Sequence, residues 1–418
     1  THRALMFSAM ARGASSIAAP EVGEDNLSTA QVLRELGVEI TATADGFSVN
    51  SKGFTEWRTP SRALDCGNSG TTMRLMAGAL AGRGLRSVLT GDASLSRRPM
   101  RRVSEPLRML GAEIRGREEA GTERAPLQVG EGRFEGGAYN SPVASAQVKS
   151  ALLLAGVTSG RPVTVSEPVQ SRDHTERMLA SMGADLEVGG DTTVVFRPGQ
   201  PLAPMDCRVP GDASSAAFVA AAVAAGTDGE VRLEQVSANP TRLGWVKPME
   251  AMGFRLTWSH ERVSVGEPFG DLTVIRDAAA SGVVEINGAE VPALIDELVV
   301  LPAVAAAVGS GFRVSGAKEL RHKESDRIDE VVRLLGGFGV EVQPFDDGFE
   351  VPANQSLRPA VGLDVASDHR VALTGLVLAL MAPGESVLHG TDIANVSFPS
   401  VVEAFCGLGA GIEVDERA

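Results

Sequence analysis

A dense group of charged side chains, at residues 323–327, is the part of the sequence best suited to chemistry. It contains Lys323, Glu324, Asp326 and Arg327, at the start of a run with the apolar spacing of a helix. Positions 323 and 327 are four residues apart, so on a helix the two cations would share a face and could converge on one anion. Exposed salt bridges along a solvated helix would explain the same residues. The converging interpretation predicts a site for an anionic group, with Glu324 as a carboxylate in a positive field.

Two further charged segments stand directly before apolar runs. Asp368, His369 and Arg370 precede one of these runs, and Asp296 and Glu297 precede the other. A carboxylate beside an apolar segment is partly desolvated, which raises its pKa. Two or three carboxylates could therefore take part in acid–base chemistry. The sequence shows neither metal-ligand spacing nor a nucleotide fingerprint, so we expect no metal and no other cofactor.

The N-terminal half contains two helix starts that are suited to anions or hydroxyls. Residues 67–72 read GNSGTT, with little side-chain bulk and many backbone N–H groups, and a helical run follows at 73–80. Such a start binds anions, although it is also an ordinary helix cap, and it lacks the ending of a P-loop. Ser145 and Gln147 precede a second apolar helix. Their side chains offer neutral hydrogen bonds to sugar-like hydroxyls or to a phosphate.

Arginines are clustered in the segment SRRPMRRV. Four of them fall within six residues: Arg97, Arg98, Arg101 and Arg102. We expect most of these arginines to form a solvated face, whereas the guanidinium group of one could bind a phosphate or carboxylate through two parallel hydrogen bonds. Arg172 and His174 lie in a turn before another helical run, and we expect His174 to cap that helix.

The elements that must position these residues follow a repeat. Each copy has an amphipathic helical run, a Gly, and then strand-like alternation. A Gly just past a helix end adopts the left-handed conformation that other residues resist. The copies recur at intervals of 70 to 86 residues, at Gly37, Gly111, Gly183, Gly253, Gly339 and Gly409. This spacing predicts six small α/β subdomains.

A chain of 418 residues is too long for one ordinary core, so we expect two domains, residues 1–210 and 211–418, of three repeats each. The boundary lies in VPGDASSAAF, and SSAAFVAAAVAA predicts a helix. Domains joined at one or two crossings could close over a ligand.

Charge and hydropathy exclude several classes of protein. A net charge of −14 argues against nonspecific nucleic-acid binding. We expect no leader and no membrane span, and therefore a cytoplasmic location. We also expect a monomer. The three cysteines are expected to be small buried residues in a reducing compartment.

Several motifs, in their order along nearly the whole chain, resemble the 5-enolpyruvylshikimate-3-phosphate synthase family of enolpyruvyl transferases. They are GNSGTTMR, SRRP, SAQVKSALLLAG, TERMLASMGA, PGDASSAAF, IDELVVLPA, KESDR and DHRVAL. KESDR together with DHR is highly specific, whereas GNSGT is shared with a sister family. The resemblance implies an α/β fold of two enolpyruvyl transferase-like domains, each with three βαβαββ units around a pseudo-threefold axis. It also implies two small-molecule substrates, phosphoenolpyruvate and shikimate 3-phosphate.

The resemblance assigns roles to individual residues. Asp296 resembles the general base that takes the proton of the 5-hydroxyl, and Glu324 resembles the acid that protonates the methylene carbon of phosphoenolpyruvate. The positions that match shikimate 3-phosphate contacts are Arg3, Ser145, Ala146, Gln147, Arg172, Asp296 and Lys323. Those that match positions facing phosphoenolpyruvate are Gly70, Arg98, Gln147, Arg327 and Arg370.

The sequence departs from the family pattern at several places. Family members carry a Pro-Gly-x-Lys-Ser segment shortly before the position of Arg3, and we expect a chain without it to be impaired or inactive. Glu319 and Val396 stand where one branch of the family has an Asn and a Lys, whereas Arg172 resembles the branch known for glyphosate tolerance. That tolerance is linked to Ala at the position of Gly70, so Gly leaves inhibitor sensitivity open.

Two alternative functions are weaker. The sister enzyme that acts on UDP-N-acetylglucosamine usually has a Cys in the loop that here reads GDASLSRRP, and this loop has none. A nonenzymatic binding protein on the same fold would have no need of Asp296 and Glu324.

Overall fold

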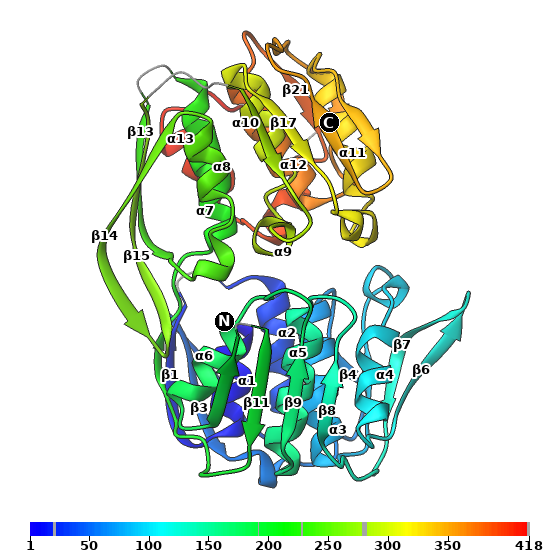
Figure 1. The fold of residues 1–418 in the computed structure, drawn as a ribbon. Helices are drawn as coiled ribbons and strands as arrows, with labels where there is room; N and C mark the ends of the chain where they lie inside the picture. Colours follow the sequence, from blue (N-terminus) through cyan, green and yellow to red (C-terminus); the bar gives the residue numbers. More distant parts are fainter. Residues whose placement is uncertain (20–21, 191, 227–228, 278–281, 416–418) are drawn as a thin grey trace. The chain divides into compact units, whose positions relative to one another are not determined.

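The chain divides into two compact units (Figure 1). A computed structural model describes residues 1–19, 22–190, 192–226, 229–277 and 282–415. The N-terminal unit comprises Thr1–Val209 with Val263–Glu267, and the C-terminal unit comprises Pro210–Arg262 with Pro268–Ala418. The chain therefore passes between the units at three points, where the sequence suggested one or two, because the tip of a long hairpin groups with the N-terminal unit.

The N-terminal unit contains three four-stranded sheets that share one strand pattern. In each sheet the first two strands run parallel. The third strand is antiparallel to the second, and the fourth forms a hairpin with the third. The strand orders are β12-β1-β3-β2, β4-β5-β7-β6 and β8-β9-β11-β10. The strands are β1 (Arg12–Ala18), β2 (Glu39–Thr43), β3 (Gly46–Lys52), β4 (Leu64–Asp65), β5 (Ser87–Thr90), β6 (Ile114–Glu119), β7 (Thr122–Val129), β8 (Gly137–Asn140), β9 (Val163–Ser166), β10 (Asp185–Gly189), β11 (Thr193–Arg197) and β12 (Asp206–Arg208). The helices are α1 (His2–Met10), α2 (Glu24–Glu35), α3 (Gly70–Arg83), α4 (Arg101–Met109), α5 (Ala146–Ser159) and α6 (His174–Ser181), with short 3₁₀ turns η1 (Phe54–Glu56) and η2 (Leu95–Arg97).

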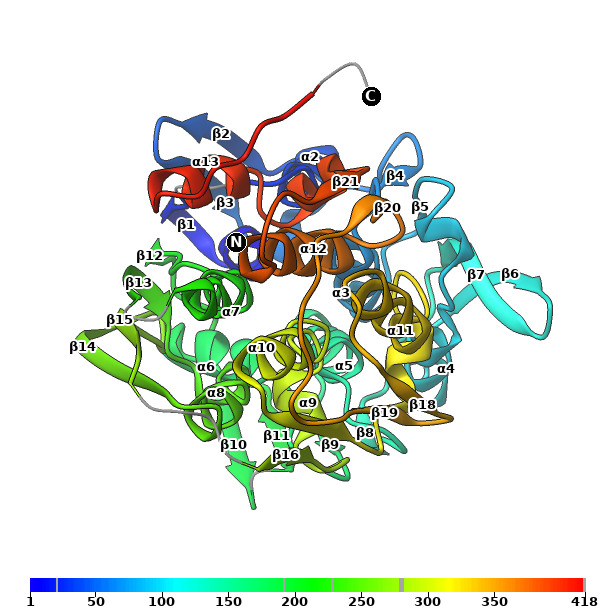
Figure 2. The same ribbon diagram turned by 90° about the horizontal axis from the view of Figure 1, so that it is seen from above.

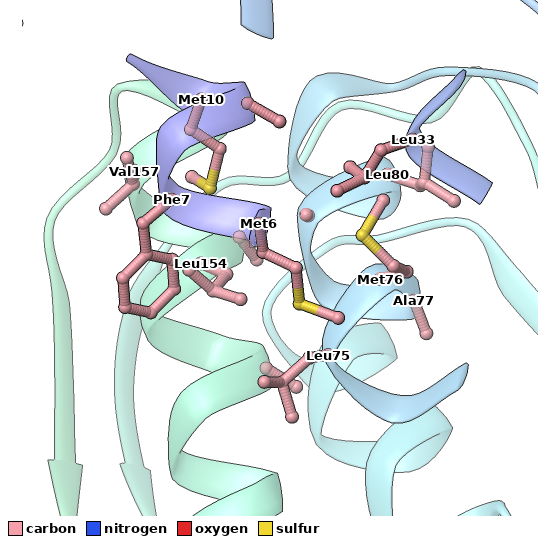
Figure 3. Packing of buried hydrophobic residues seen from close by; sticks show 14 of the residues in the cluster. Met6, Phe7, Met10, Leu33, Leu75, Met76, Ala77, Leu80, Leu154 and Val157 are labelled. Atoms are coloured by element: carbon pink, nitrogen blue, oxygen red, sulfur yellow. The ribbon is translucent and has the colours of Figure 1, made fainter. Parts of the chain in front are cut away.

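The core of this unit lies where α1, α3 and α5 meet. The backbones of α3 and α5 approach closely, because a Cβ added to Gly78 would lie 2.1 Å from the carbonyl oxygen of Ala151 and one added to Gly82 would lie 2.2 Å from that of Ala155. Thr158 joins the two helices with a hydrogen bond of 2.9 Å to the carbonyl of Ala79. Figure 3 shows the buried side chains around this contact: Met6, Phe7, Met10, Leu33, Leu75, Met76, Ala77, Leu80, Leu154 and Val157.

The C-terminal unit uses the same strand pattern less completely. The sheet β16-β17-β19-β18 repeats it, the sheet β13-β15-β14 has three strands, and β20 and β21 form only a parallel pair. The strands are β13 (Glu230–Ser237), β14 (Phe254–Ser264), β15 (Glu267–Arg276), β16 (Val283–Ile286), β17 (Gly311–Val314), β18 (Gln343–Phe345), β19 (Gly348–Val351), β20 (Val361–Asp364) and β21 (Val387–His389).

In Figure 2 the strands of this unit lie around α7, α10 and α12, and α12 packs against the other two helices. The helices are α7 (Ala213–Ala222), α8 (Val246–Ala251), α9 (Val291–Leu294), α10 (Leu301–Val308), α11 (Arg327–Gly337), α12 (His369–Met381) and α13 (Val401–Gly407), with 3₁₀ turns η3 (Val223–Ala225), η4 (Pro240–Arg242), η5 (Lys318–His322) and η6 (Thr391–Val396). The helix predicted at SSAAFVAAAVAA is α7, and the side chain of Asp212 caps it by accepting from the backbone N–H of Ser215.

The repeat predicted from the glycines is confirmed at five of its six copies. All six glycines have a positive φ, between 81° and 97°. Strands β2, β6, β10, β14 and β18 follow the first five. The prediction of a strand after Gly409 is wrong, since residues 411–415 form none. All five strands pair with the next strand along the chain, and the described residues after Gly409 offer no such partner.

Candidate active site

The start of α3 gathers cationic groups in the N-terminal unit. Ser69 caps the helix by accepting from the backbone N–H of Thr72 at 3.1 Å. Gly70 is the first helical residue, and a Cβ built on it would lie 3.1 Å from Nη1 of Arg74 and 3.5 Å from Nη1 of Arg98. Two guanidinium groups therefore face a helix N-terminus, where the helix dipole also favours an anion.

The four clustered arginines have different environments. Arg98 donates from Nη2 to Oδ1 of Asn68 at 2.8 Å, which holds it beside the start of α3. Arg102 donates to the hydroxyl of Ser145 at 3.4 Å. Arg101 forms an exposed ion pair with a glutamate of β6. The expected solvated face therefore describes Arg97, which is exposed, and Arg101. Arg98 instead lies beside Gly70 and Arg102 reaches Ser145, two residues predicted to bind substrate.

The start of α5 lies two residues earlier than the sequence suggested. Ala146 begins the helix and Ser145 is its N-cap, so Gln147 lies in the first turn rather than before it. Oε1 of Gln147 accepts from Arg74 at 2.7 Å, and its Nε2 donates to Thr71 at 3.3 Å. Arg74 thus links α3 to α5. Sequence reasoning missed Arg74 because it stands inside an apolar helical run that gives no sign of its partner.

Arg3 and Arg172 belong to the same unit. Arg3, on α1, donates from Nε to Thr175 at 2.8 Å and from Nη2 to Ser150 at 3.2 Å. These hydroxyls lie on α6 and α5, so Arg3 is held where the three helices meet. Arg172 is half-buried, two residues before α6 begins.

The prediction that His174 caps a helix is wrong. Asp173 occupies the N-cap position of α6, and His174 is the first helical residue. Its Nδ1 instead contacts Oε1 of Glu267 at 2.8 Å. The partner lies 93 residues away along the chain, so local sequence could not identify it.

Arg327 is the centre of the charged group in the C-terminal unit. It is 1% exposed and donates to three carboxylates, at 3.1 Å to Asp296, 2.9 Å to Glu324 and 2.9 Å to Asp368. Burial alone would lower the pKa of Arg327, but the three carboxylates outweigh burial and raise it above its ordinary value. Arg327 therefore stays charged and fixes the positions of the carboxylates.

Asp296 faces three cations. Its Oδ1 lies 3.1 Å from Arg327 and 3.8 Å from Lys323, and its Oδ2 lies 3.6 Å from Arg370. The residue is 7% exposed and lies in the turn after α9. The structure thus brings together five of the predicted site residues: Asp296, Lys323, Glu324, Arg327 and Arg370.

Lys323 and Arg327 converge, but not as neighbours on one helix face. Lys323 follows the 3₁₀ turn η5, and α11 begins only at Arg327. Asp326 ends the intervening loop and caps α11 by accepting from two backbone N–H groups. The predicted helical spacing is therefore wrong, because the capping Asp holds the preceding residues out of the helix.

Arg370 connects this group to a second buried carboxylate. Asp368 caps α12 by accepting from the backbone N–H of Arg370, and Nη1 of Arg370 donates to Ser214 at 2.7 Å. Ser214 in turn donates to Glu297. Burial raises the pKa of Glu297, and the nearby Asp296 adds to the effect. The raised pKa that the apolar run predicted is confirmed for Glu297.

Other expectations concerned cysteines, metals and membranes. Cys66 and Cys207 are buried as expected, but Cys406 is exposed near the end of α13. Burial raises the pKa of the Cys66 thiol. Among the described residues no group of three or more His, Cys, Asp or Glu side chains could hold a metal ion. In that part of the chain, every helix is too short or too polar to span a membrane.

Buried ionisable groups that perturb one another's pKa are concentrated at the functional sites of enzymes. The fold agrees with such a class. The structure matches that of EPSP synthase from Acinetobacter baumannii with a TM-score of 0.88 and 36% identity, over 99% of this chain and 94% of the other. The protein therefore has the two-domain enolpyruvyl transferase fold.

Sequence comparison gives the family. Residues 1–405 match the family model of EPSP synthase (3-phosphoshikimate 1-carboxyvinyltransferase). The 3-phosphoshikimate 1-carboxyvinyltransferase of Synechococcus sp. (strain CC9605) is 46% identical, over 96% of this chain and 91% of that protein. The enzyme of the same name from Bacillus cytotoxicus is 41% identical, over 98% and 95%. The chain belongs to the EPSP synthase family.

Proposed function

We propose that this protein transfers the enolpyruvyl group of phosphoenolpyruvate to the 5-hydroxyl of shikimate 3-phosphate and releases inorganic phosphate. The observation that carries this proposal is the group around Asp296, where one carboxylate faces Lys323, Arg327 and Arg370. It occurs in a chain that is 41–46% identical to proteins named for this reaction. An anionic carboxylate can accept a proton, and the cations around it can bind phosphate or carboxylate groups.

The reaction needs a base and an acid. Asp296 accepts the proton of the 5-hydroxyl as that oxygen bonds to C2 of phosphoenolpyruvate, and Glu324 donates a proton to the methylene carbon. The resulting tetrahedral intermediate carries a methyl group. It then loses a methyl proton to Glu324 and expels phosphate, which takes the proton from Asp296. The double bond is restored, and both side chains return to their starting forms.

We propose a second role for Arg327, in addition to its predicted contact with phosphoenolpyruvate. It binds both Asp296 and Glu324, so it fixes the base and the acid relative to each other. Such alignment is worth much in catalysis, because a small misplacement of a reacting group lowers the rate steeply. Arg370, which also contacts Asp296, supplies further positive charge.

The N-terminal unit supplies the other proposed contacts. Gly70 and Arg98, at the start of α3, are proposed to face phosphoenolpyruvate. The proposed contacts of shikimate 3-phosphate in this unit are Arg3, Ser145, Ala146, Gln147 and Arg172. The hydrogen bonds of Arg3 to α5 and α6, and of Gln147 to Arg74, support these roles, since they hold both side chains in defined positions.

The test is phosphate release by the full-length protein from phosphoenolpyruvate with each of two acceptors. We expect turnover with shikimate 3-phosphate and none with UDP-N-acetylglucosamine. Turnover with the nucleotide sugar alone would overturn the proposal and favour the sister enzyme. Binding of shikimate 3-phosphate without any turnover would favour a nonenzymatic protein. That the protein acts as a cytoplasmic monomer is also our proposal, and analytical ultracentrifugation tests the monomeric state.

A further inference from the structure

A buried lysine joins three segments of the N-terminal unit. Lys149, on α5, is 2% exposed. Its ammonium group lies 2.8 Å from Glu167, 2.8 Å from Glu176 and 3.5 Å from the backbone carbonyl oxygen of Ser171. An ammonium has three N–H groups, so these three acceptors match its full donor capacity. The proposed reaction makes no use of this cluster.

Glu167 connects the cluster to two segments that are proposed to bind substrate. One carboxylate oxygen accepts from the backbone N–H of Ser145 at 2.7 Å. The other accepts from the hydroxyl of Ser171 at 2.7 Å and from its backbone N–H at 3.4 Å. Ser145 is a proposed substrate contact, and Ser171 directly precedes another, Arg172. A single buried side chain therefore fixes the backbone at both places.

A layer of hydroxyl groups continues the same contact between α5 and α6. Ser150 follows Lys149 in the sequence, Thr175 precedes Glu176, and the two hydroxyls lie 2.6 Å apart. Both accept from Arg3. The position of Arg3 thus depends on how α5 and α6 are held together, and the ion pairs of Lys149 lie at that contact.

We propose that Glu167 and Lys149 are positioning residues that set the geometry of the shikimate 3-phosphate contacts in the N-terminal unit. The inference rests on the proposed function for the identity of that substrate. Removing three charged groups from water is costly, and the cost is recovered only when their hydrogen bonds are made. Here those bonds end on the backbone of Ser145 and Ser171, so the same interactions that satisfy the charges also fix the substrate segments.

Glu176 offers a matched control. It contacts Lys149 as Glu167 does, but its Oε2 has no hydrogen-bond partner among the described residues. Burial raises the pKa of Glu176, and the positive charge of Lys149 partly opposes this increase. A glutamine at 176 can keep its oxygen on Lys149 and turn its NH₂ toward the side without a partner. A glutamine at 167 cannot, because donors stand on both sides of the carboxylate.

The experiment compares Glu167→Gln with Glu176→Gln in the full-length protein. We expect Glu167→Gln to raise the KM for shikimate 3-phosphate on the order of tenfold, because the substrate segments shift, with a smaller change in kcat. We expect Glu176→Gln to change this KM by less than about threefold. The amide hydrogens of Ser145 and Ser171 should exchange faster only in the first variant, and this readout does not depend on activity.

The outcomes separate this inference from the proposed function. Absence of wild-type turnover contradicts the proposed function, whereas the exchange measurement still tests the positioning. Equal KM values and equal exchange in the two variants would overturn the positioning role while leaving the function intact. If Glu167→Gln fails to fold, Ser171→Ala removes only the hydroxyl bond to Glu167. An unchanged KM in that variant would likewise overturn the inference.

Discussion

Asp296 and Arg98 are the residues on which the proposed chemistry depends most directly. Asp296 faces cations from the loop before α11, from α11 itself and from α12. Arg98 directly follows the 3₁₀ turn η2, and its side chain lies beside the start of α3. The first is proposed to move a proton and the second to bind an anion, so their substitution should change different kinetic parameters.

Asp296→Asn should lower kcat by roughly 10²-fold or more, because an amide cannot accept the proton of the 5-hydroxyl. Shikimate 3-phosphate should still bind, which titration calorimetry can measure. The matched control is Glu330→Gln, which changes a carboxylate that pairs with Arg333 on the surface of α11. A kcat near that of the wild type in Asp296→Asn would remove this residue from the chemistry.

Arg98→Ala should weaken phosphoenolpyruvate binding on the order of tenfold, since one charge-assisted hydrogen bond is lost, and should affect shikimate 3-phosphate much less. Arg101→Ala is the control, because this neighbouring arginine pairs with Glu118 at the surface. Dissociation constants for both substrates provide the measurement. Equal weakening of both substrates by Arg98→Ala would show that the residue is assigned to the wrong one.

At the scale of elements, the contact between α3 and α5 sets the spacing of two proposed binding segments. Each helix begins at such a segment, with Gly70 on α3 and Ala146 on α5. Glycines at 78 and 82 let the backbones approach, and Arg74 links the first turns through Gln147. The relative position of the two helix starts is therefore fixed both in the core and at the site.

Gly78→Ala should destabilise the protein by about 1–3 kcal/mol or more, because the new methyl group would collide with a backbone carbonyl that cannot rotate away. Gly336→Ala, on α11, is the control. A Cβ there meets nothing within 4 Å, so we expect no loss of stability. Denaturant unfolding measures both. Similar stability of the two variants would contradict the close helix approach.

At the scale of the whole molecule, the buried apolar residues form two separate clusters. One lies within residues 4–207 and the other within residues 217–405. Each unit thus has a core of its own, as expected for a domain that can unfold by itself. This organisation supports our proposal of two domains that meet near residue 210.

Calorimetry should therefore resolve two unfolding transitions. Gly78→Ala should lower the midpoint of one, and Phe312→Ala should lower that of the other. Phe312 is fully buried and stacks on Phe349 with ring centroids 6.2 Å apart, so its truncation should cost about 3–5 kcal/mol. If both variants shifted one common transition, the two cores would unfold as a single cooperative unit, contrary to this prediction.

The sequence by itself determined the features whose causes are local. The left-handed glycines, the cap of α3 at Ser69 and the cap of α7 at Asp212 each depend on residues within one helical turn. The family motifs could also be identified from the sequence, since they are short runs of adjacent residues. Local physical chemistry and motif resemblance were therefore sufficient for five of the six repeat copies and for the fold class, and they supplied the site residues that are proposed above.

Only the tertiary structure decided which side chains meet. Arg74 lies 73 residues from Gln147, and Arg327 lies 31 residues from Asp296 and 41 from Asp368. The same holds for the partner of His174, which the sequence could not identify. A side chain's type limits what it can bind, but its partner is set by which distant segments the packed helices and sheets bring within hydrogen-bonding distance.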